Sequence, residues 1–171
     1  MARYRIDPAR SRVAIEATSS LHPIHSETDG LEGWLELDVD GSGRLVTDTV
    51  PRAHLELPVD RLRSGNPMED RELRRRIDAR RFPTIIGELV AMEALGADGR
   101  YRVRGDVTFK GVTRAREDEM TVAADGDGGL RLQGSSVFDI REFGMEPPRI
   151  LFVKVAPHVT VTVDIVARKE E

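Results

Sequence analysis

Residues 101–109 read YRVRGDVTF, and this short stretch contains the pattern that decides the fold. Apolar or small residues occupy every second position from Tyr101 to Phe109, and charged or polar residues lie between them. A period of two is typical of a strand with one buried face and one solvated face. Strands of this kind are typical of antiparallel sheets that pack one face on a core. The stretch therefore predicts a half-buried antiparallel strand.

The same alternation recurs along the rest of the chain. It is present at residues 13–17, 31–39, 53–59, 130–140 and 159–165. Hairpin-like turns rich in Gly and Asp separate the strands at 40–43, 96–99 and 125–129. About eight strands at regular spacing, without a βαβ rhythm, predict an all-β antiparallel barrel or sandwich. No linker interrupts the pattern, so residues 1–171 are predicted to form a single domain.

Composition narrows the classes of function. The 171 residues carry a net charge of −4, so no overall basic field indicates a nucleic-acid partner. The absence of cysteine excludes disulfides, thiolate metal sites and cysteine nucleophiles. No apolar run approaches a membrane span, which argues against stable membrane insertion. The N-terminus, beginning at Met1, has no apolar run of signal-peptide length, and we therefore expect the protein to stay in the cytoplasm.

One helix interrupts the strands, and it is predicted over residues 67–80. Asn66 suits the N-cap, Pro67 suits the first helical position, and Glu69 is placed to complete a capping box. Pro83 prevents the helix from continuing. A single helix in an antiparallel barrel cannot connect parallel strands. We therefore expect it to lie across the mouth, with its apolar face turned inward.

The arginines of this helix allow two interpretations. Guanidinium groups could clamp a diphosphate head group through paired hydrogen bonds. Acidic residues are interleaved with the arginines, however, and this pattern favours a solvated helix face balanced by neighbouring ion pairs. Arg71 and Arg75, together with Arg141 beyond the helix, remain the candidates for contact with a polar head.

No metal site or catalytic constellation emerges from the remaining polar residues. His22 and His25 in the HPIH segment suggest a metal pair, but Pro23 keeps that segment extended and no helix presents both rings on one face. Ser135 and Ser136 lack a nucleophile elbow. We therefore predict no metal, no cofactor and no catalytic residues.

Several motifs, in order, resemble the YceI-like family of polyisoprenoid-binding, lipocalin-like barrels. The resemblance rests on YRIDPARSRVAI at 4–15, SGN at 64–66, RRFPTI at 80–85, GDVTFKGVT at 105–113 and IREFGM at 140–145. It implies an eight-stranded antiparallel up-and-down barrel with a short helix near the opening. It also implies that the apolar bore binds an isoprenoid or fatty chain. Relatives usually carry a bulky Phe where this chain has Gly87.

The barrel face and the helix together define the candidate ligand-binding residues. They are Leu35, Leu37, Leu55, Leu57, Met68, Leu73, Ile77, Phe82, Ile85, Gly87, Val107, Phe109, Phe138 and Phe143. The hypothesis that follows is a non-catalytic carrier or sequestering protein for a long apolar ligand such as an isoprenoid or fatty acid derivative.

Three alternatives stay open at the level of the sequence. Periodicity alone does not distinguish a hollow barrel from one filled by interdigitating side chains, and a filled barrel would act through its surface. An enzyme or chaperone-like factor for a hydrophobic intermediate would need polar groups in the bore, for which His22, His25 and Arg141 are the candidates. The outward parity of Trp34 leaves a homodimer open.

Overall fold

The computed structural model describes residues 1–46, 48–96, 98–126, 128–147, 149–150 and 153–171. Two of the predicted turns, 96–99 and 125–129, each include one residue outside these ranges. The strands are β1 (Ala2–Ile6), β2 (Arg12–Ser19), β3 (Ile24–Thr28), β4 (Glu32–Leu37), β5 (Arg52–Pro58), β6 (Thr84–Ala94), β7 (Arg100–Phe109), β8 (Val112–Asp125), β9 (Gly129–Asp139), β10 (Arg149–Ile150) and β11 (Val153–Lys169). The helical segments are η1 (Val59–Arg61), α1 (Pro67–Ile77) and η2 (Ile140–Phe143).

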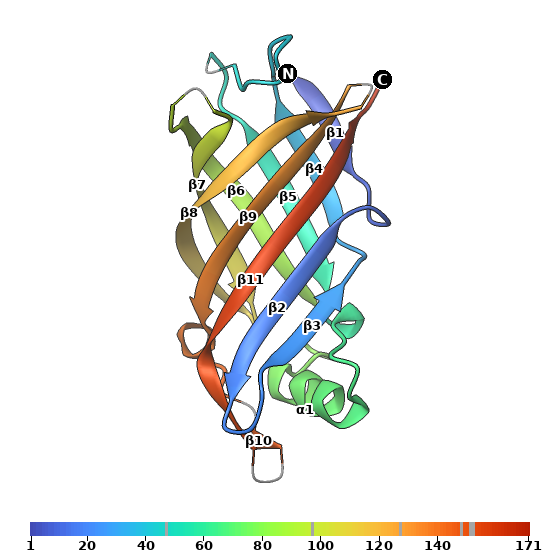
Figure 1. Cartoon of the computed structure of the whole chain (residues 1–171), viewed down its shortest axis with the longest axis vertical. Helices are drawn as coiled ribbons and strands as arrows, with labels where there is room; N and C mark the ends of the chain where they lie inside the picture. The colour runs from blue at the N-terminus through green and yellow to red at the C-terminus, as the bar shows by residue number, and fades with distance from the viewer. Residues whose placement is uncertain (47, 97, 127, 148, 151–152) are drawn as a thin grey trace.

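The strands form a closed, up-and-down antiparallel barrel, as the alternation and the family resemblance predict. The ring runs β1-β4-β5-β6-β7-β8-β9-β11 and closes where β11 pairs with β1, which gives eight strands. β2 continues the line of β1 along the same edge of β11, and β3 pairs with β2 (Figure 1). Between β1 and β2, the fully buried Ser11 exchanges hydrogen bonds with the backbone of Val166, so β11 stays paired across the break.

One end of the barrel is filled by side chains. This packed end, where both termini lie (Figure 1), holds Tyr4, Leu37, Tyr101 and Leu130, each no more than 3% exposed. The Tyr101 hydroxyl also accepts a hydrogen bond from the Leu45 backbone N–H at 2.9 Å, which ties the β4–β5 connection across this end. A chain molecule could not pass here without displacing the core.

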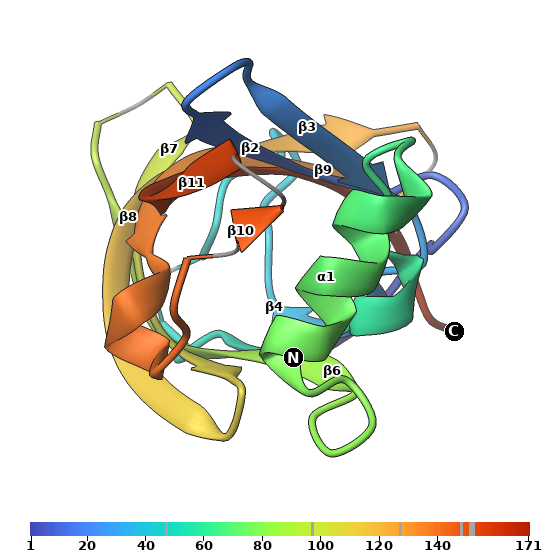
Figure 2. The ribbon, with the colours of Figure 1, turned by 90° about the horizontal axis from the view of Figure 1, so that it is seen from below.

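The other end carries α1, which lies across part of the barrel mouth in the view from below (Figure 2). Its N-terminus is capped as predicted, because the Asn66 side chain accepts hydrogen bonds from the backbone N–H groups of Met68 and Glu69. Ile77 is 1% exposed and packs with Val59 against the barrel. We call this the helix end.

Two details of the helix prediction are wrong. The helix ends at Ile77 rather than at residue 80, because Asp78 adopts a left-handed conformation and its N–H donates to the carbonyl groups of Arg74 and Arg75. The capping box does not form either. The Asn66 N–H donates to the Ser64 hydroxyl oxygen, which leaves the Glu69 carboxylate to face the barrel mouth.

Candidate ligand-binding site

The barrel interior contains a cavity beside α1 that we call the lower chamber. Its volume is about 300 Å³, at the small end of the range of small-molecule sites. Leu73 and Ile77 from α1 form part of its wall, and inward-facing residues of the strands form the rest. Aliphatic and aromatic side chains dominate the wall, so a ligand here would be held by burial of apolar surface.

A second cavity of about 230 Å³, the upper chamber, lies between the lower chamber and the packed end. Leu55, Gly87 and Val107 belong to the walls of both chambers, so the two adjoin along one bore. Gly87 has no side chain at this junction. A Cβ atom placed on it would lie 3.5 Å from Leu55 Cδ1, an ordinary contact distance.

Three aromatic rings form one part of the lower wall. Phe143 lies edge-on to Phe109 with ring centres 5.7 Å apart and is tilted against Phe138 at 6.3 Å. These distances are favourable for aromatic pairs. η2 supplies Phe143 and also Ile140 to the lower chamber, so this short segment completes the wall where β9 ends.

The structure places twelve of the fourteen predicted ligand-binding residues on the walls of the bore. Leu35 and Leu37 line the upper chamber, and ten residues line the lower one: Leu55, Leu57, Leu73, Ile77, Ile85, Gly87, Val107, Phe109, Phe138 and Phe143. Their contact with a ligand stays a prediction.

Met68 and Phe82 were expected inside the bore, and both expectations are wrong. Met68 is 54% exposed at the start of α1 and lines neither chamber. Phe82 lies beyond the helix, with the Arg81 guanidinium over its ring and the ring edge filling the space that the missing side chain of Gly111 leaves. Because Asp78 ends α1 early, Phe82 is not on the face that carries Leu73.

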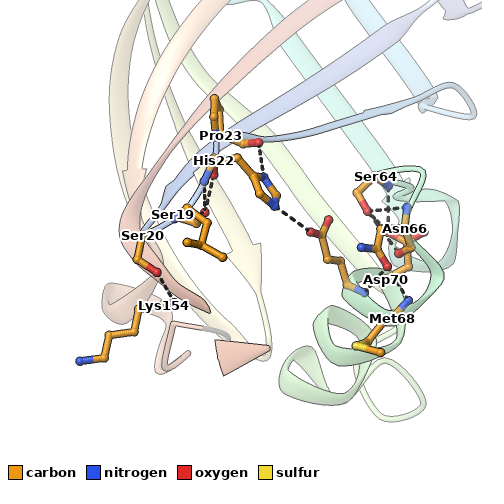
Figure 3. Close-up of polar contacts among 11 residues, drawn as sticks. Ser19, Ser20, His22, Pro23, Ser64, Asn66, Met68, Asp70 and Lys154 are labelled. Atoms are coloured by element: carbon orange, nitrogen blue, oxygen red, sulfur yellow. Dashed lines mark hydrogen bonds and ion pairs between the residues drawn. The ribbon is translucent and has the colours of Figure 1, made fainter. Parts of the chain in front are cut away.

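The edge of the mouth is formed by polar groups from α1 and the β2–β3 turn (Figure 3). The buried Asp70 carboxylate accepts hydrogen bonds from the Ser64 N–H and hydroxyl, both at 2.8 Å, which fixes the loop before the helix. His22 Nε2 in the β2–β3 turn lies 4.0 Å from Glu69 Oε1 on α1. This approach brings the turn close to the helix at the mouth.

The predicted head-group arginines lie outside both chambers. Arg75 is exposed and donates two hydrogen bonds to Glu72, which together with Arg76 lower the pKa of that carboxyl to about 2. Arg141 is bound in the same way to Asp139 and lowers its pKa to about 2. Arg71 is also exposed. This arrangement matches the solvated, acid-balanced alternative, and a head-group role for these arginines stays a prediction.

The sequence reasoning missed a charged pair in the upper chamber, Arg116 and Asp118 of β8. The register of β8 on β7 places Arg116 opposite Gly105 and Asp118 opposite Val103, both on the inner face. The sequence does contain a signal for this pair. The tight turn at Lys110 and Gly111 fixes which residues of β8 lie opposite the inward residues of β7. Charged residues on both faces of β8 hid the alternation of apolar and polar positions that marks the other strands.

The histidines of the HPIH segment do not converge. His25 lies on the outer face of β3, between Glu16 and Glu27, whereas the His22 ring interacts with the Pro23 carbonyl and Glu69. Within the described ranges, no group of three or more His, Asp or Glu side chains is arranged to hold a metal ion. Nor does any helix in that part of the chain have the length and apolar character needed to cross a membrane.

Comparison with solved structures supports the fold. The chain superposes on the crystal structure of Burkholderia cenocepacia BcnA with a TM-score of 0.77 at 18% identity, covering 94% of this chain and 98% of that one. A polyisoprenoid binding domain from Saccharophagus degradans, implicated in plant cell wall breakdown, gives a TM-score of 0.76 at 12% identity, covering 98% of both chains. The Campylobacter jejuni YceI protein gives 0.65 at 13% identity, covering 85% and 84%.

No curated protein matched the chain. The model of the YceI-like domain, in contrast, matches residues 4–167, which is nearly the whole chain. Together with the closed barrel and its apolar bore, this match shows that the chain belongs to the YceI-like family.

Proposed function

We propose that this protein binds a long apolar molecule, of the isoprenoid or fatty-chain class, in the barrel interior and acts as a non-catalytic carrier or sequestering protein. The observation that carries the proposal is the bore itself, in which two largely apolar chambers adjoin at Gly87. The similarity to a polyisoprenoid binding domain adds support, although at 12% identity it concerns the fold.

The energetics suit a chain-like ligand. Burial of each CH₂ contributes about 0.8 kcal/mol, so ten or more buried carbons offset the cost of association without a specific polar contact. The aliphatic walls and the ring group around Phe143 provide that burial along the length of the bore. Affinity is therefore expected to follow chain length more than chain identity.

The filled-barrel alternative is less well supported. Side chains fill the packed end completely, but the two chambers remain below it. The enzyme alternative relied on His22, His25 and Arg141. Of these, only His22 approaches the mouth, through its contact with Glu69, a residue of the lower chamber wall.

The experiment that tests the proposal is mass spectrometry of organic extracts from the purified protein. We expect an apolar compound at close to one molecule per chain, released by denaturation. If the protein carries no such compound, and addition of fatty alcohols or polyprenols does not raise its melting temperature, the carrier function is excluded. Retention in the cytoplasm remains a prediction, which cell fractionation would test.

A further inference from the structure

The inner wall of the upper chamber carries a polar cluster formed by Arg116, Asp118 and Ser136. β8 and β9 pair only between Met120–Asp125 and Gly129–Gly134. The two strands separate before Met120 in β8 and after Gly134 in β9, as the diverging ribbons of Figure 1 show. The cluster lies where this separation begins, with two members on β8 and one on β9.

The three side chains contact one another across the separation. Arg116 Nη2 donates to Ser136 Oγ at 2.9 Å, and Ser136 Oγ donates to Asp118 Oδ2 at 2.8 Å. Arg116 Nη2 also donates to the Val137 carbonyl at 2.7 Å, which supplies β9 with a hydrogen bond at an edge that β8 no longer covers. The cluster is therefore held in place by both strands.

These contacts do not occupy every hydrogen-bond donor of the Arg116 guanidinium. Its Nε is buried and has no hydrogen-bond partner among the described residues. The guanidinium also lies 4.5 Å from the ring centre of Phe138, a residue of the lower chamber wall. Polar groups facing an apolar cavity are costly unless they are paired, so the cluster favours a ligand that brings its own polar atoms to this point.

The charge around the cluster determines which polar atoms suit it. Arg116 and Asp118 offset each other, with Arg116 Nη2 lying 3.8 Å from Asp118 Oδ1. Among the described residues that border the upper chamber, Arg116 and Asp118 are the only charged residues whose side chains face inward, because Glu88, Asp106 and Glu119 alternate with inward-facing neighbours and turn their side chains to the outer face. A carboxylate or phosphate would meet the Asp118 carboxylate without a base left to balance it, whereas a hydroxyl or carbonyl group could exchange hydrogen bonds with the guanidinium, the serine and the carboxylate.

We propose that the Arg116–Asp118–Ser136 cluster binds the polar head of the bore ligand, and that this head is an uncharged hydroxyl or carbonyl group. The inference rests on the proposed function, since it requires a ligand in the bore. It places the head deep in the upper chamber rather than at the arginines of α1. The apolar chain then extends past Gly87 into the lower chamber and toward the mouth.

The test compares three probes of equal chain length at about pH 8, where the acid is ionised: 1-dodecanol, dodecanoate and dodecane. Binding is measured by displacement of N-phenyl-1-naphthylamine and by melting temperature. We expect dodecanol to bind the parent protein about tenfold more tightly than either other probe. Dodecane lacks the one or two hydrogen bonds that the hydroxyl group makes, and the charge of dodecanoate is repelled by the Asp118 carboxylate.

Two variants and one control make the test specific. Arg116→Met should reduce dodecanol binding to the level of dodecane. Asp118→Asn should raise dodecanoate binding about tenfold, because it leaves the guanidinium charge uncompensated. Arg131→Met removes an arginine on the outer face of β9, where it pairs with Asp164 at 2.6 Å, and should change no probe.

The outcomes separate this inference from the proposed function. If no probe binds the parent protein, both fail. If all three probes bind equally, or dodecanoate binds best, the bore holds a ligand but the head-group assignment is overturned. Should Arg116→Met fail to fold, the change of selectivity in Asp118→Asn decides, and an unchanged preference there would contradict the assignment.

Discussion

At the scale of single residues, the absence of a side chain at Gly87 shapes the bore most directly. Gly87 lies at the junction of the two chambers, and its cross-strand partner is Leu55. The family resemblance implies a large aromatic residue at this point, so we expect the junction to be wider here than in a barrel that carries one. The length of ligand that the bore accepts should therefore depend on this position.

Replacing Gly87 with Phe is expected to separate the chambers. Binding of alkyl chains with about sixteen carbons should fall at least about tenfold, whereas alkanes of about eight carbons, which need no head-group contact, should bind nearly as before, because most of the lower chamber wall lies away from the junction. The melting temperature should stay constant or rise, since filling a real cavity costs little. Val90→Phe, on the exposed outer face of the same strand, is the control. A strong loss of stability in Gly87→Phe alone would mean that the junction is already packed.

His54 provides a residue-scale prediction on stability. Hydrogen bonds from its ring to Glu56, at 2.8 Å, and to Glu88 raise the pKa of the imidazole above its ordinary value of 6.5. A raised folded-state pKa stabilises the fold fully below about pH 6.5, and this stabilisation is lost as the pH rises through the folded-state pKa. The difference in melting temperature between the parent and His54→Gln should therefore be largest near pH 6 and shrink toward about pH 9. A difference that grows with pH would contradict this account.

At the scale of elements, α1 depends on its N-cap for a defined start. The Asn66 side chain accepts two backbone hydrogen bonds, and without it those donors would have to find water at the edge of the mouth. Asn66→Ala should lower the free energy of unfolding by about 1 kcal/mol, whereas Asn66→Ser, which keeps a capping oxygen, should recover most of it. Urea denaturation measures both. Equal losses in the two variants would mean that the cap oxygen is not what stabilises the helix.

The strands show how much of the fold the sequence predicts. Strands with one apolar face, such as β7 and β9, follow from the period of two, and their parity places Val107 and Phe138 correctly in the bore. β8 breaks the rule because its inner face changes from apolar at Val122 to charged at Asp118 and Arg116. Hydrogen bonds to Ser136 of β9 offset the cost of placing these charges on the inner face. Partners that lie so far apart in the sequence cannot be recognised from a local pattern of residues.

At the scale of the whole molecule, the two ends of the barrel differ. Side chains fill the packed end, while α1 covers part of the helix end and contacts the β2–β3 turn through His22 and Glu69 (Figures 2 and 3). The sequence left hollow and filled barrels equally open because both have the same alternation of apolar and polar residues. Only the closed structure shows that one barrel can be filled at one end and hollow below it.

This asymmetry predicts that ligands enter and leave at the helix end, where α1 must separate from the β2–β3 turn. The chain has no cysteine, so the double variant His22→Cys/Glu69→Cys can be bridged selectively with a bis-maleimide that contains a reducible disulfide. Bridging should slow the exchange of a bound fatty alcohol at least about tenfold, and reduction of the linker should restore it. The bridged pair Arg131→Cys/Asp164→Cys, on the outer wall, controls for modification itself. If exchange is equally fast with the mouth bridged, the ligand must take another route, and the separation between β8 and β9 at Arg116 would be the place to bridge next.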